Sequence, residues 1–392
     1  MNQLPQINNN TSRSVHVSIP RSHAAYEISI ERGVLDRVGE MTAASGHSHV
    51  AIVSNQKVFG LYGDRVKKSL ETAGRHVSVC LIGDGERYKN SKTLLTILEH
   101  LSAEKVGRTD AVIALGGGVV GDVAGFAASV HLRGIAFVQM PTTLLAMIDS
   151  SVGGKTGINS SYGKNLTGTI YQPAGVLIDV DVLQTLDPRE FKAGIFEAVK
   201  QGAISGRGLF RKTTKFIDGL AEGKGREDFS DETLNSMEVL IAEQVKFKAT
   251  IVKGDEREAT AKTSIRSRKI LNFGHTFAHA LEKVTDYKYL KHGEAVGYGI
   301  LFAASLSKSL ELLPADELNL LNDVVHRVGG LPPLGNISPQ EAILSLEHDK
   351  KIVGNSLHWV LMKGIGKPVI VPGEKIDKKL LLKTAERIIA SS

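Results

Sequence analysis

Two histidines and one glutamate in the second half of the chain are the residues best suited to chemistry. Glu197 interrupts a segment with helical spacing at 193–200. His275 opens a second such segment, and His279 shares its helix face because the two stand four residues apart. His292 begins a third segment. Two imidazoles and one carboxylate suit a catalytic divalent metal and leave a coordination position open. The alternative is that these helices end in polar residues satisfied by ordinary hydrogen bonds.

A glycine-rich segment indicates a bound dinucleotide. Residues 116–122 read Gly-Gly-Gly-Val-Val-Gly-Asp after an apolar run, which fits the G-x-G-x-x-G pattern between a strand and a helix. Glycine allows the pyrophosphate to approach closely, and the helix N-terminus supplies free amide donors. A tight strand-to-helix turn is the alternative. The acidic residue usual for the ribose is missing, because none lies between Asp122 and Asp149. The polar groups available for the adenosine end of NAD are Asn55, Glu86 and Lys89.

The segment 141–157 is typical of a polar active-site wall, because it combines hydroxyl groups, Asp149 and Lys155 with several glycines. Its Gly-Gly-Lys-Thr resembles the end of a P-loop, but Asp149 stands where that motif needs its first glycine, so we exclude a nucleoside triphosphatase. Basic residues elsewhere would each suit a solvated surface, yet together they would bind a phosphate and a carboxylate. They are Arg133, Lys164, Lys200, Lys253, Arg268, Lys350 and Lys351.

Length and composition describe a two-domain cytoplasmic protein. The chain has 392 residues, which is more than one ordinary hydrophobic core accommodates. Of these residues 42% are hydrophobic and 23% are charged, as is typical of a globular protein. Cys80 is the single cysteine, which excludes an intramolecular disulfide and fits a reducing compartment. The net charge of +6 comes without a basic run with interleaved aromatics, so we expect no nucleic-acid partner. The apolar window 111–130 holds five glycines and Asp122, so we expect no membrane span.

The pattern along the chain predicts an α/β fold in two domains. Residues 1–14 are polar, lack the features of a signal peptide and are expected to form a disordered tail. Short β-rich runs then alternate with helix-length segments, at 15–19, 26–30, 50–53, 76–81, 111–115 and 136–140. Beyond Pro188 helical spacing dominates, at 234–250, 295–313 and 315–328. We therefore predict an NAD-binding α/β domain at 15–188 and a mainly α-helical domain for metal and substrate at 189–392.

Taken together, these motifs resemble the 3-dehydroquinate synthase family of the sugar phosphate cyclases. The resemblance runs from about residue 15 into the C-terminal region. It is densest at 115–122, 141–157, 163–165, 271–276 and 292–294. It implies a Rossmann-like N-terminal domain that binds NAD and a helical C-terminal domain that holds zinc or cobalt. It also implies an active site between the domains and a homodimer.

The resemblance implies a reaction as well. The substrate would be 3-deoxy-D-arabino-heptulosonate 7-phosphate, which is oxidised transiently by NAD, loses phosphate by elimination and is reduced again. Its ring then opens and an intramolecular aldol step yields 3-dehydroquinate, an intermediate of the shikimate pathway to the aromatic amino acids. NAD would be regenerated in each cycle, and the metal would act as a Lewis acid.

The resemblance assigns roles to individual residues. The implied metal ligands are Glu197, His275 and His292. The implied NAD contacts are Asn55, Glu86, Lys89, Gly117, Gly118, Asp122, Thr142, Thr143, Lys164 and Thr185, with Asn55 standing where aspartate is common. The implied catalytic residues are Asp149, Lys155, Asn165 and His279, the last as a proton relay. The implied substrate contacts are Arg133, Lys200, Lys253, Arg268, Asn272 and one of the pair Lys350 and Lys351.

Three other functions stay open at this point. One is a cyclase for another sugar phosphate, such as 2-deoxy-scyllo-inosose synthase, although Arg268 favours a carboxylated substrate. A second is a metal-dependent alcohol dehydrogenase, for which we would expect more histidine ligands. The third is a nucleotide-binding module without catalysis, which the coexistence of metal, NAD and anion sites disfavours. Phosphate release from candidate sugar phosphates separates them.

Overall fold

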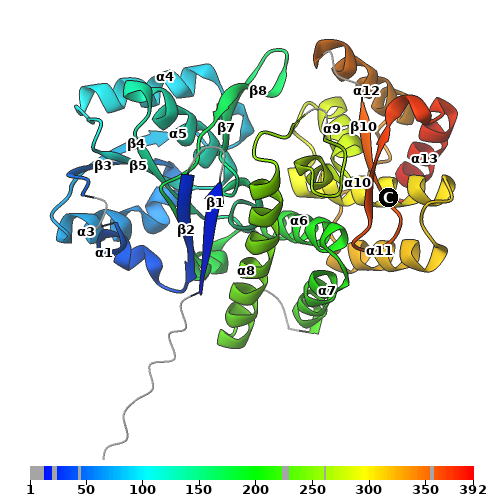
Figure 1. Ribbon diagram of the computed structural model, residues 1–392, viewed down its shortest axis with the longest axis horizontal. Coiled ribbons are helices and arrows are strands. Elements are labelled where there is room, and N and C mark those ends of the chain that lie inside the picture. Colours follow the sequence, from blue (N-terminus) through cyan, green and yellow to red (C-terminus); the bar gives the residue numbers. More distant parts are fainter. Residues whose placement is uncertain (1–12, 20–23, 43–45, 223–228, 260–261, 354–356) are drawn as a thin grey trace, which may run out of the picture.

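The computed structural model describes residues 13–19, 24–42, 46–222, 229–259, 262–353 and 357–392 (Figure 1). Residues 1–12 of the predicted tail lie outside this description. The last two residues of that predicted tail, Arg13 and Ser14, belong to the first strand. No helix in the described segments combines the length and the apolar character that a membrane crossing requires.

A seven-stranded sheet forms the first half of the molecule, in the order β1-β2-β9-β6-β5-β3-β4. All six predicted strands are confirmed, as β1 (Arg13–Ile19), β2 (Ala24–Glu31), β3 (His49–Asn55), β4 (His76–Ile82), β5 (Ala111–Gly116) and β6 (Ala136–Pro141). The seventh, β9 (Gly175–Asp179), is not among the predicted strands. β1 runs antiparallel to β2, and the other neighbours run parallel.

The sheet has a core on each face, because its side chains alternate. Val50 and Ile52 of β3 point to the side of α3 (Asp64–Thr72). Ala51 and Val53 point to the side of α4 (Ser91–Ala103) and α5 (Gly118–Val130). Since Ser54 of β3 pairs with Leu115 of β5, and Leu115 with Met140 of β6, the three strands end at one edge. The segments that follow them therefore open onto a common space.

The second half of the chain is mainly helical, as predicted. Its helices are α6 (Pro188–Ser205), α7 (Arg207–Glu222), α8 (Asp231–Gly254), α9 (His275–Val284), α10 (His292–Ser309), α11 (Ala315–Val328), α12 (Pro339–Val353) and α13 (Lys378–Ala390). α10 is buried from Gly293 to Ser307 and packs against α6, α9, α11 and α13. A hairpin of β10 (His358–Met362) and β11 (Pro368–Pro372) also packs here, and the sequence pattern did not predict it.

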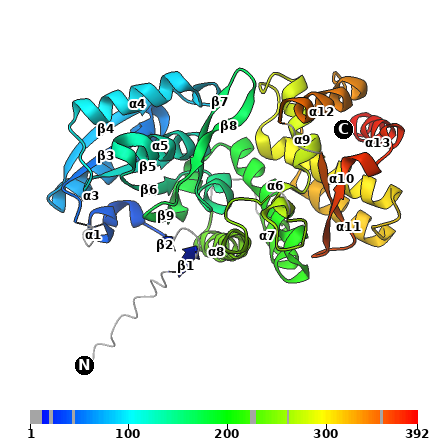
Figure 2. The ribbon, with the colours of Figure 1, turned by 45° about the horizontal axis from the view of Figure 1, so that its top comes forward.

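A second hairpin connects the two halves. β7 (Lys155–Ser160) and β8 (Gly163–Ile170) pair antiparallel, and both views show them between the sheet and the helical half (Figure 1, Figure 2). The last residues of the segment predicted as a polar active-site wall, 155–157, belong to β7. The hairpin carries Lys155, Lys164 and Asn165, so its position decides where three predicted site residues lie.

Candidate active site

One cavity of about 890 Å³ lies between the carboxyl edge of the sheet and the helical half. It takes residues from the segments after β3, β5 and β6, from the β7–β8 hairpin, and from α6, α8, α9 and the start of α10. Most of the residues singled out from the sequence line it. They are Asn55, Glu86, Lys89, Gly117, Gly118, Asp122, Thr142, Thr143, Asp149, Lys155, Lys164, Asn165, Thr185, Lys200, Arg268, Asn272, His275, His279 and His292.

The predicted metal ligands lie together although they are far apart in sequence. Glu197 is fully buried on α6, while His275 opens α9 and His292 opens α10. Glu197 Oε1 lies 3.6 Å from His275 Nε2 and 3.5 Å from His292 Nε2. Their ligand atoms all lie within 4.8 Å of one another. Three donors thus surround a space of the size that one metal ion needs.

The chemistry of this donor set fits a divalent metal. Glu197 Oε1 is buried and accepts no hydrogen bond from the described residues, which is costly unless a cation takes that place. Glu197 Oε2 lies 2.5 Å from Lys200 Nζ. Burial and the nearby Lys200 hold the pKa of His275 well below its usual range. Its imidazole is therefore neutral, as a metal ligand must be.

A glycine and an ion pair hold two of these helices, α6 and α10, close together. A Cβ atom at Gly293 would lie 2.0 Å from the backbone oxygen of Ala193, so α10 begins directly against α6. An ion pair ties the same two helices, since Arg189 Nε lies 2.5 Å from Glu294 Oε1 and Arg189 Nη2 lies 2.7 Å from Glu294 Oε2. The carboxylate-bearing helix and the helix that starts with His292 are thereby fixed to each other.

A carboxylate and two lysines form the floor of the cavity. Asp149 Oδ1 lies 2.7 Å from Lys248 Nζ, and Gln201 Nε2 donates to the same oxygen at 3.4 Å. Burial acts to raise the pKa of Asp149, but Lys248 and Lys200 hold it well below its usual range. Burial lowers the pKa of Lys248 to about 8. Asp149 is therefore an anion that keeps a buried ammonium group in place.

Lys248 was missed from the sequence, and the structure places it at the cavity where Lys253 was predicted as a substrate contact. Lys253 is exposed and does not line the cavity in the described structure. The two lysines differ in their position around the axis of helix α8. Lys248 stands on the buried face of α8, three residues after Val245 and four before Val252, and Lys253 lies on the other face. The spacing of Lys248 from buried apolar residues of the same helix was the signal that would have identified this lysine.

Arg268 and Asn272 lie beside Lys155 on another wall. Arg268 is 4% exposed, and its Nη1 donates to the backbone oxygens of Gly153 at 2.9 Å and Glu256 at 2.8 Å. Glu258, also missed from the sequence, lies 2.5 Å from Lys155 Nζ and accepts from Asn272 Nδ2 at 3.1 Å. The stretch between α8 and α9 gave no helical or strand pattern, so no sequence signal placed Glu258.

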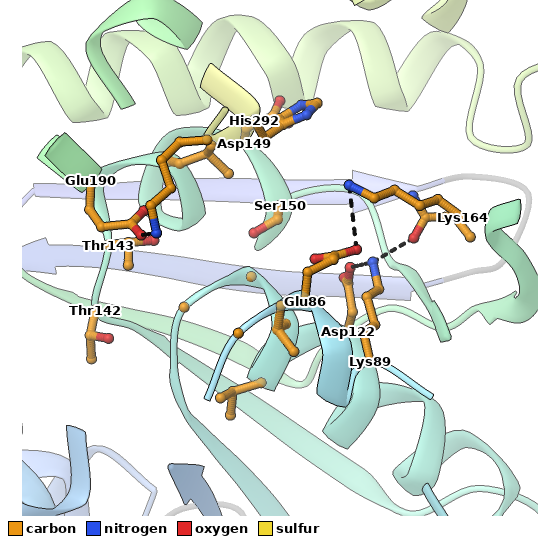
Figure 3. A pocket seen from close by; sticks show the side chains of 18 of the residues that line it. Glu86, Lys89, Asp122, Thr142, Thr143, Asp149, Ser150, Lys164, Glu190 and His292 are labelled. Carbon is orange, nitrogen blue, oxygen red and sulfur yellow. Dashed lines mark hydrogen bonds and ion pairs between the residues drawn. The ribbon is translucent and has the colours of Figure 1, made fainter. Parts of the chain in front are cut away.

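The predicted nucleotide contacts surround the N-terminus of α5. Gly117 is its N-cap residue. Lys89 Nζ lies 2.5 Å from both Asp122 Oδ2 and Asn165 Oδ1, and Lys164 Nζ lies 3.8 Å from Glu86 Oε1 (Figure 3). Burial acts to lower the pKa of Lys89, but Asp122 and Glu86 raise it, so the ammonium group stays charged.

The remaining nucleotide candidates come from the strand ends. Asn55 accepts from the backbone N of Val58 at 2.9 Å and donates to Asp84 Oδ1 at 3.0 Å, so its amide already has two partners. Thr142 and Thr143 follow β6, and Thr185 hydrogen-bonds to Tyr62. This wall presents hydroxyl groups and backbone amides beside the glycine segment.

Two further predictions concern Arg133 and the pair Lys350 and Lys351. Arg133 is exposed and does not line the cavity in the described structure, so its role as a substrate contact stays a prediction. α5 begins at the cavity and runs for 13 residues, which carries Arg133 about 20 Å away at 1.5 Å per residue. Lys350 and Lys351 belong to α12, but their side chains lie outside the described residues.

Comparisons with known proteins show which sequences this chain is similar to. The model of the N-terminal part of 3-dehydroquinate synthase matches residues 79–193, and the model of its C-terminal part matches 194–352. The 3-dehydroquinate synthase of Microcystis aeruginosa is 39% identical over 350 residues, which is 88% of this chain and 91% of the relative. That of Citrifermentans bemidjiense is 41% identical over 354 residues, 89% of this chain and 93% of the relative.

Solved structures share the arrangement. A 2-deoxy-scyllo-inosose synthase complexed with carbaglucose-6-phosphate, NAD⁺ and Co²⁺ has a TM-score of 0.81 at 25% identity, covering 96% of this chain and 99% of that one. A 2-epi-5-epi-valiolone synthase from Streptomyces hygroscopicus with NAD⁺ and Zn²⁺ bound has a TM-score of 0.82 at 26% identity, covering 94% and 98%. A butanol dehydrogenase from Thermotoga maritima, at 16% identity and a TM-score of 0.64 over 91% and 94% of the two chains, shares the fold alone.

Proposed function

Because this chain belongs to the 3-dehydroquinate synthase family, we propose that its cavity converts 3-deoxy-D-arabino-heptulosonate 7-phosphate into 3-dehydroquinate and phosphate. The enzyme is a lyase that eliminates phosphate. The observation that carries the proposal is that one cavity joins a glycine-capped helix, two imidazoles that converge on the buried Glu197, and a group of buried cations. An alcohol dehydrogenase whose substrate carries no phosphate would not need such a cation group.

We propose NAD and one divalent metal, zinc or cobalt, as the cofactors, in line with the NAD⁺, Zn²⁺ and Co²⁺ bound in the two related cyclase structures. Glu197, His275 and His292 would hold the metal. The nucleotide would lie against Gly117 and Gly118, where the N-terminus of α5 favours the pyrophosphate. Bound NAD supplies a hydride acceptor and donor, and the bound metal supplies a Lewis acid for a substrate oxygen.

The side chains of the cavity bind and orient the substrate. Lys155, Lys200 and Lys248 give the site a cationic character that suits a phosphate. Arg268 presents a planar guanidinium for the carboxylate, and Asn272 adds an amide donor beside it. These contacts hold the substrate in one orientation through successive steps.

His279 is the candidate for proton transfer. It lies one helical turn from His275, with ring centroids 5.5 Å apart, and lines the cavity while remaining exposed. An exposed imidazole beside the metal set is able to exchange protons with substrate oxygens. Asp149 contributes by holding Lys248, and Asn165 by its contact with Lys89.

We further propose a division between the two domains near Pro188, a homodimer, and a cytoplasmic location. The domain division rests on the start of α6 at Pro188, and the homodimer rests on the family. The cytoplasmic location rests on the single cysteine, Cys80. Either Lys350 or Lys351 would complete the substrate contacts.

The test is an assay of the purified protein with NAD⁺, Zn²⁺ or Co²⁺, and the heptulosonate phosphate. We expect release of inorganic phosphate and formation of 3-dehydroquinate without accumulation of NADH. NADH that accumulates in proportion to product would instead identify a dehydrogenase. Turnover of glucose 6-phosphate alone would identify an inosose synthase. A protein that binds NAD⁺ but turns over neither substrate would be a binding module.

A further inference from the structure

His292 lies between two carboxylates. Its Nε2 lies 3.5 Å from Glu197 Oε1, and its Nδ1 lies 3.4 Å from both carboxylate oxygens of Glu282. Glu282 only accepts, so Nδ1 donates its proton to that carboxylate, and a cation placed beside Glu197 would meet the lone pair of Nε2. His275 is arranged alike, with Nδ1 3.4 Å from the backbone oxygen of Phe273 and Nε2 toward Glu197. Both imidazoles thus present the nitrogen that a metal needs.

Glu282 is itself fixed in place. It is 3% exposed and stands on α9 seven residues after His275, so it shares the face of that ligand. Lys164 Nζ lies 3.0 Å from Glu282 Oε1 and 4.2 Å above the ring of Tyr287. A buried carboxylate with a cation beside it stays an anion. Lys164 comes from β8, so this contact also joins the hairpin to the helical half.

We propose that Glu282 is the positioning residue for the metal ligand His292. It holds the proton at Nδ1, aims Nε2 at the space beside Glu197 and increases the electron density that the imidazole donates. Lys164 fixes Glu282 in turn. This inference rests on the proposed function, because it presupposes a metal at Glu197, His275 and His292. Loss of such a supporting partner typically weakens metal binding by about 10-fold to 100-fold.

The experiment titrates metal-free protein with Zn²⁺ in competition with a chromophoric chelator. Glu282→Gln keeps an acceptor for Nδ1 but loses the charge, and Glu282→Leu loses both. Glu238→Gln is the matched control, because Glu238 is a buried carboxylate paired with Arg13 at 2.8 Å and does not line the cavity in the described structure. His292→Ala tests the ligand set itself. Thermal unfolding of each metal-free variant reports its fold separately.

We expect Zn²⁺ affinity to fall by about 10-fold in Glu282→Gln and about 100-fold in Glu282→Leu, with Glu238→Gln unchanged. A purely structural role would instead lower the metal-free unfolding temperature and leave the affinity of the folded protein intact. If His292→Ala loses the metal while both Glu282 variants bind like Glu238→Gln, the inference is overturned. If His292→Ala keeps full affinity, the proposed metal site fails and the inference with it. Should the leucine variant not fold, the glutamine variant decides.

Discussion

The buried ammonium group of Lys248 makes the stability of this protein depend on pH in a predictable direction. Burial lowers the pKa of Lys248 from 10.5 to about 8, against the opposing effect of Asp149. Between these two pH values the unfolded chain holds the proton and the folded protein has lost it. The free energy of unfolding therefore rises with pH across this window. The two pKa values differ by about 2.5, which corresponds to about 3 kcal/mol.

The perturbation that isolates this effect is Lys248→Met. The substitution also leaves Asp149 buried without its ammonium partner, which costs about 3–5 kcal/mol. The variant itself does not titrate in this window, because methionine carries no proton to lose and the pKa of Asp149 is held well below its usual range. The stability difference between wild type and Lys248→Met should thus grow by about 3 kcal/mol from pH 7 to pH 10.5.

Urea unfolding followed by circular dichroism at the two pH values measures this difference. Lys253→Met is the matched control, because the same side chain is exchanged on the same helix at an exposed position. We expect the control to follow the wild type at both pH values. A stability difference for Lys248→Met that is equal at pH 7 and pH 10.5 would refute the reasoning, because Lys248 would then titrate alike in the folded and unfolded states.

Three further predictions concern the proposed site. His275→Ala should lose metal and activity together, whereas His279→Ala should lower turnover and keep most of the metal, as elemental analysis with steady-state kinetics will show. Arg268→Lys should reduce kcat/KM nearly as much as Arg268→Ala, by roughly a hundredfold for a loss of about 2–4 kcal/mol, because lysine lacks the planar fork. Near-normal kcat/KM in both would end the carboxylate assignment. Gly293→Ala should push α10 away from Ala193 and weaken Zn²⁺ binding by about 10-fold or more, since a 1 Å displacement of a ligand is enough to impair a site. Unchanged Zn²⁺ affinity would show that this contact does not set the ligand geometry.

The sequence allowed most of the fold to be predicted, because hydrophobic pattern and strand–helix alternation are local signals. The strands that were missed are short or rich in glycine, such as β9 and the β7–β8 hairpin, and their runs do not alternate clearly. The helical half was recognised from its spacing. The hairpin β10–β11 was overlooked because it lies in a region dominated by helices.

Site residues could be predicted where they belong to a sequence motif. They could not be predicted where their role depends on contacts with residues far away in the sequence. The structure brings Glu197, His275 and His292 together as the motifs indicated. Lys253 was predicted and Lys248 was not, because the position of each lysine around the axis of α8 was not considered. Arg133 was predicted from the family resemblance, and α5 carries it away from the cavity in the described structure. The role of Glu282 depends on contacts with a strand more than a hundred residues away, which no local pattern contains.

The pairing of charges in the cavity decides where an anionic substrate is bound most easily. Lysines that line the cavity already have a carboxylate partner, as Lys248 has Asp149 and Lys155 has Glu258. A substrate anion that binds these lysines must share them with that carboxylate. The guanidinium of Arg268 is instead held by two backbone oxygens, both through Nη1. A carboxylate is therefore able to meet Arg268 without displacing an ion pair, which is why this residue, and not the more numerous lysines, should set the preference for a carboxylated substrate.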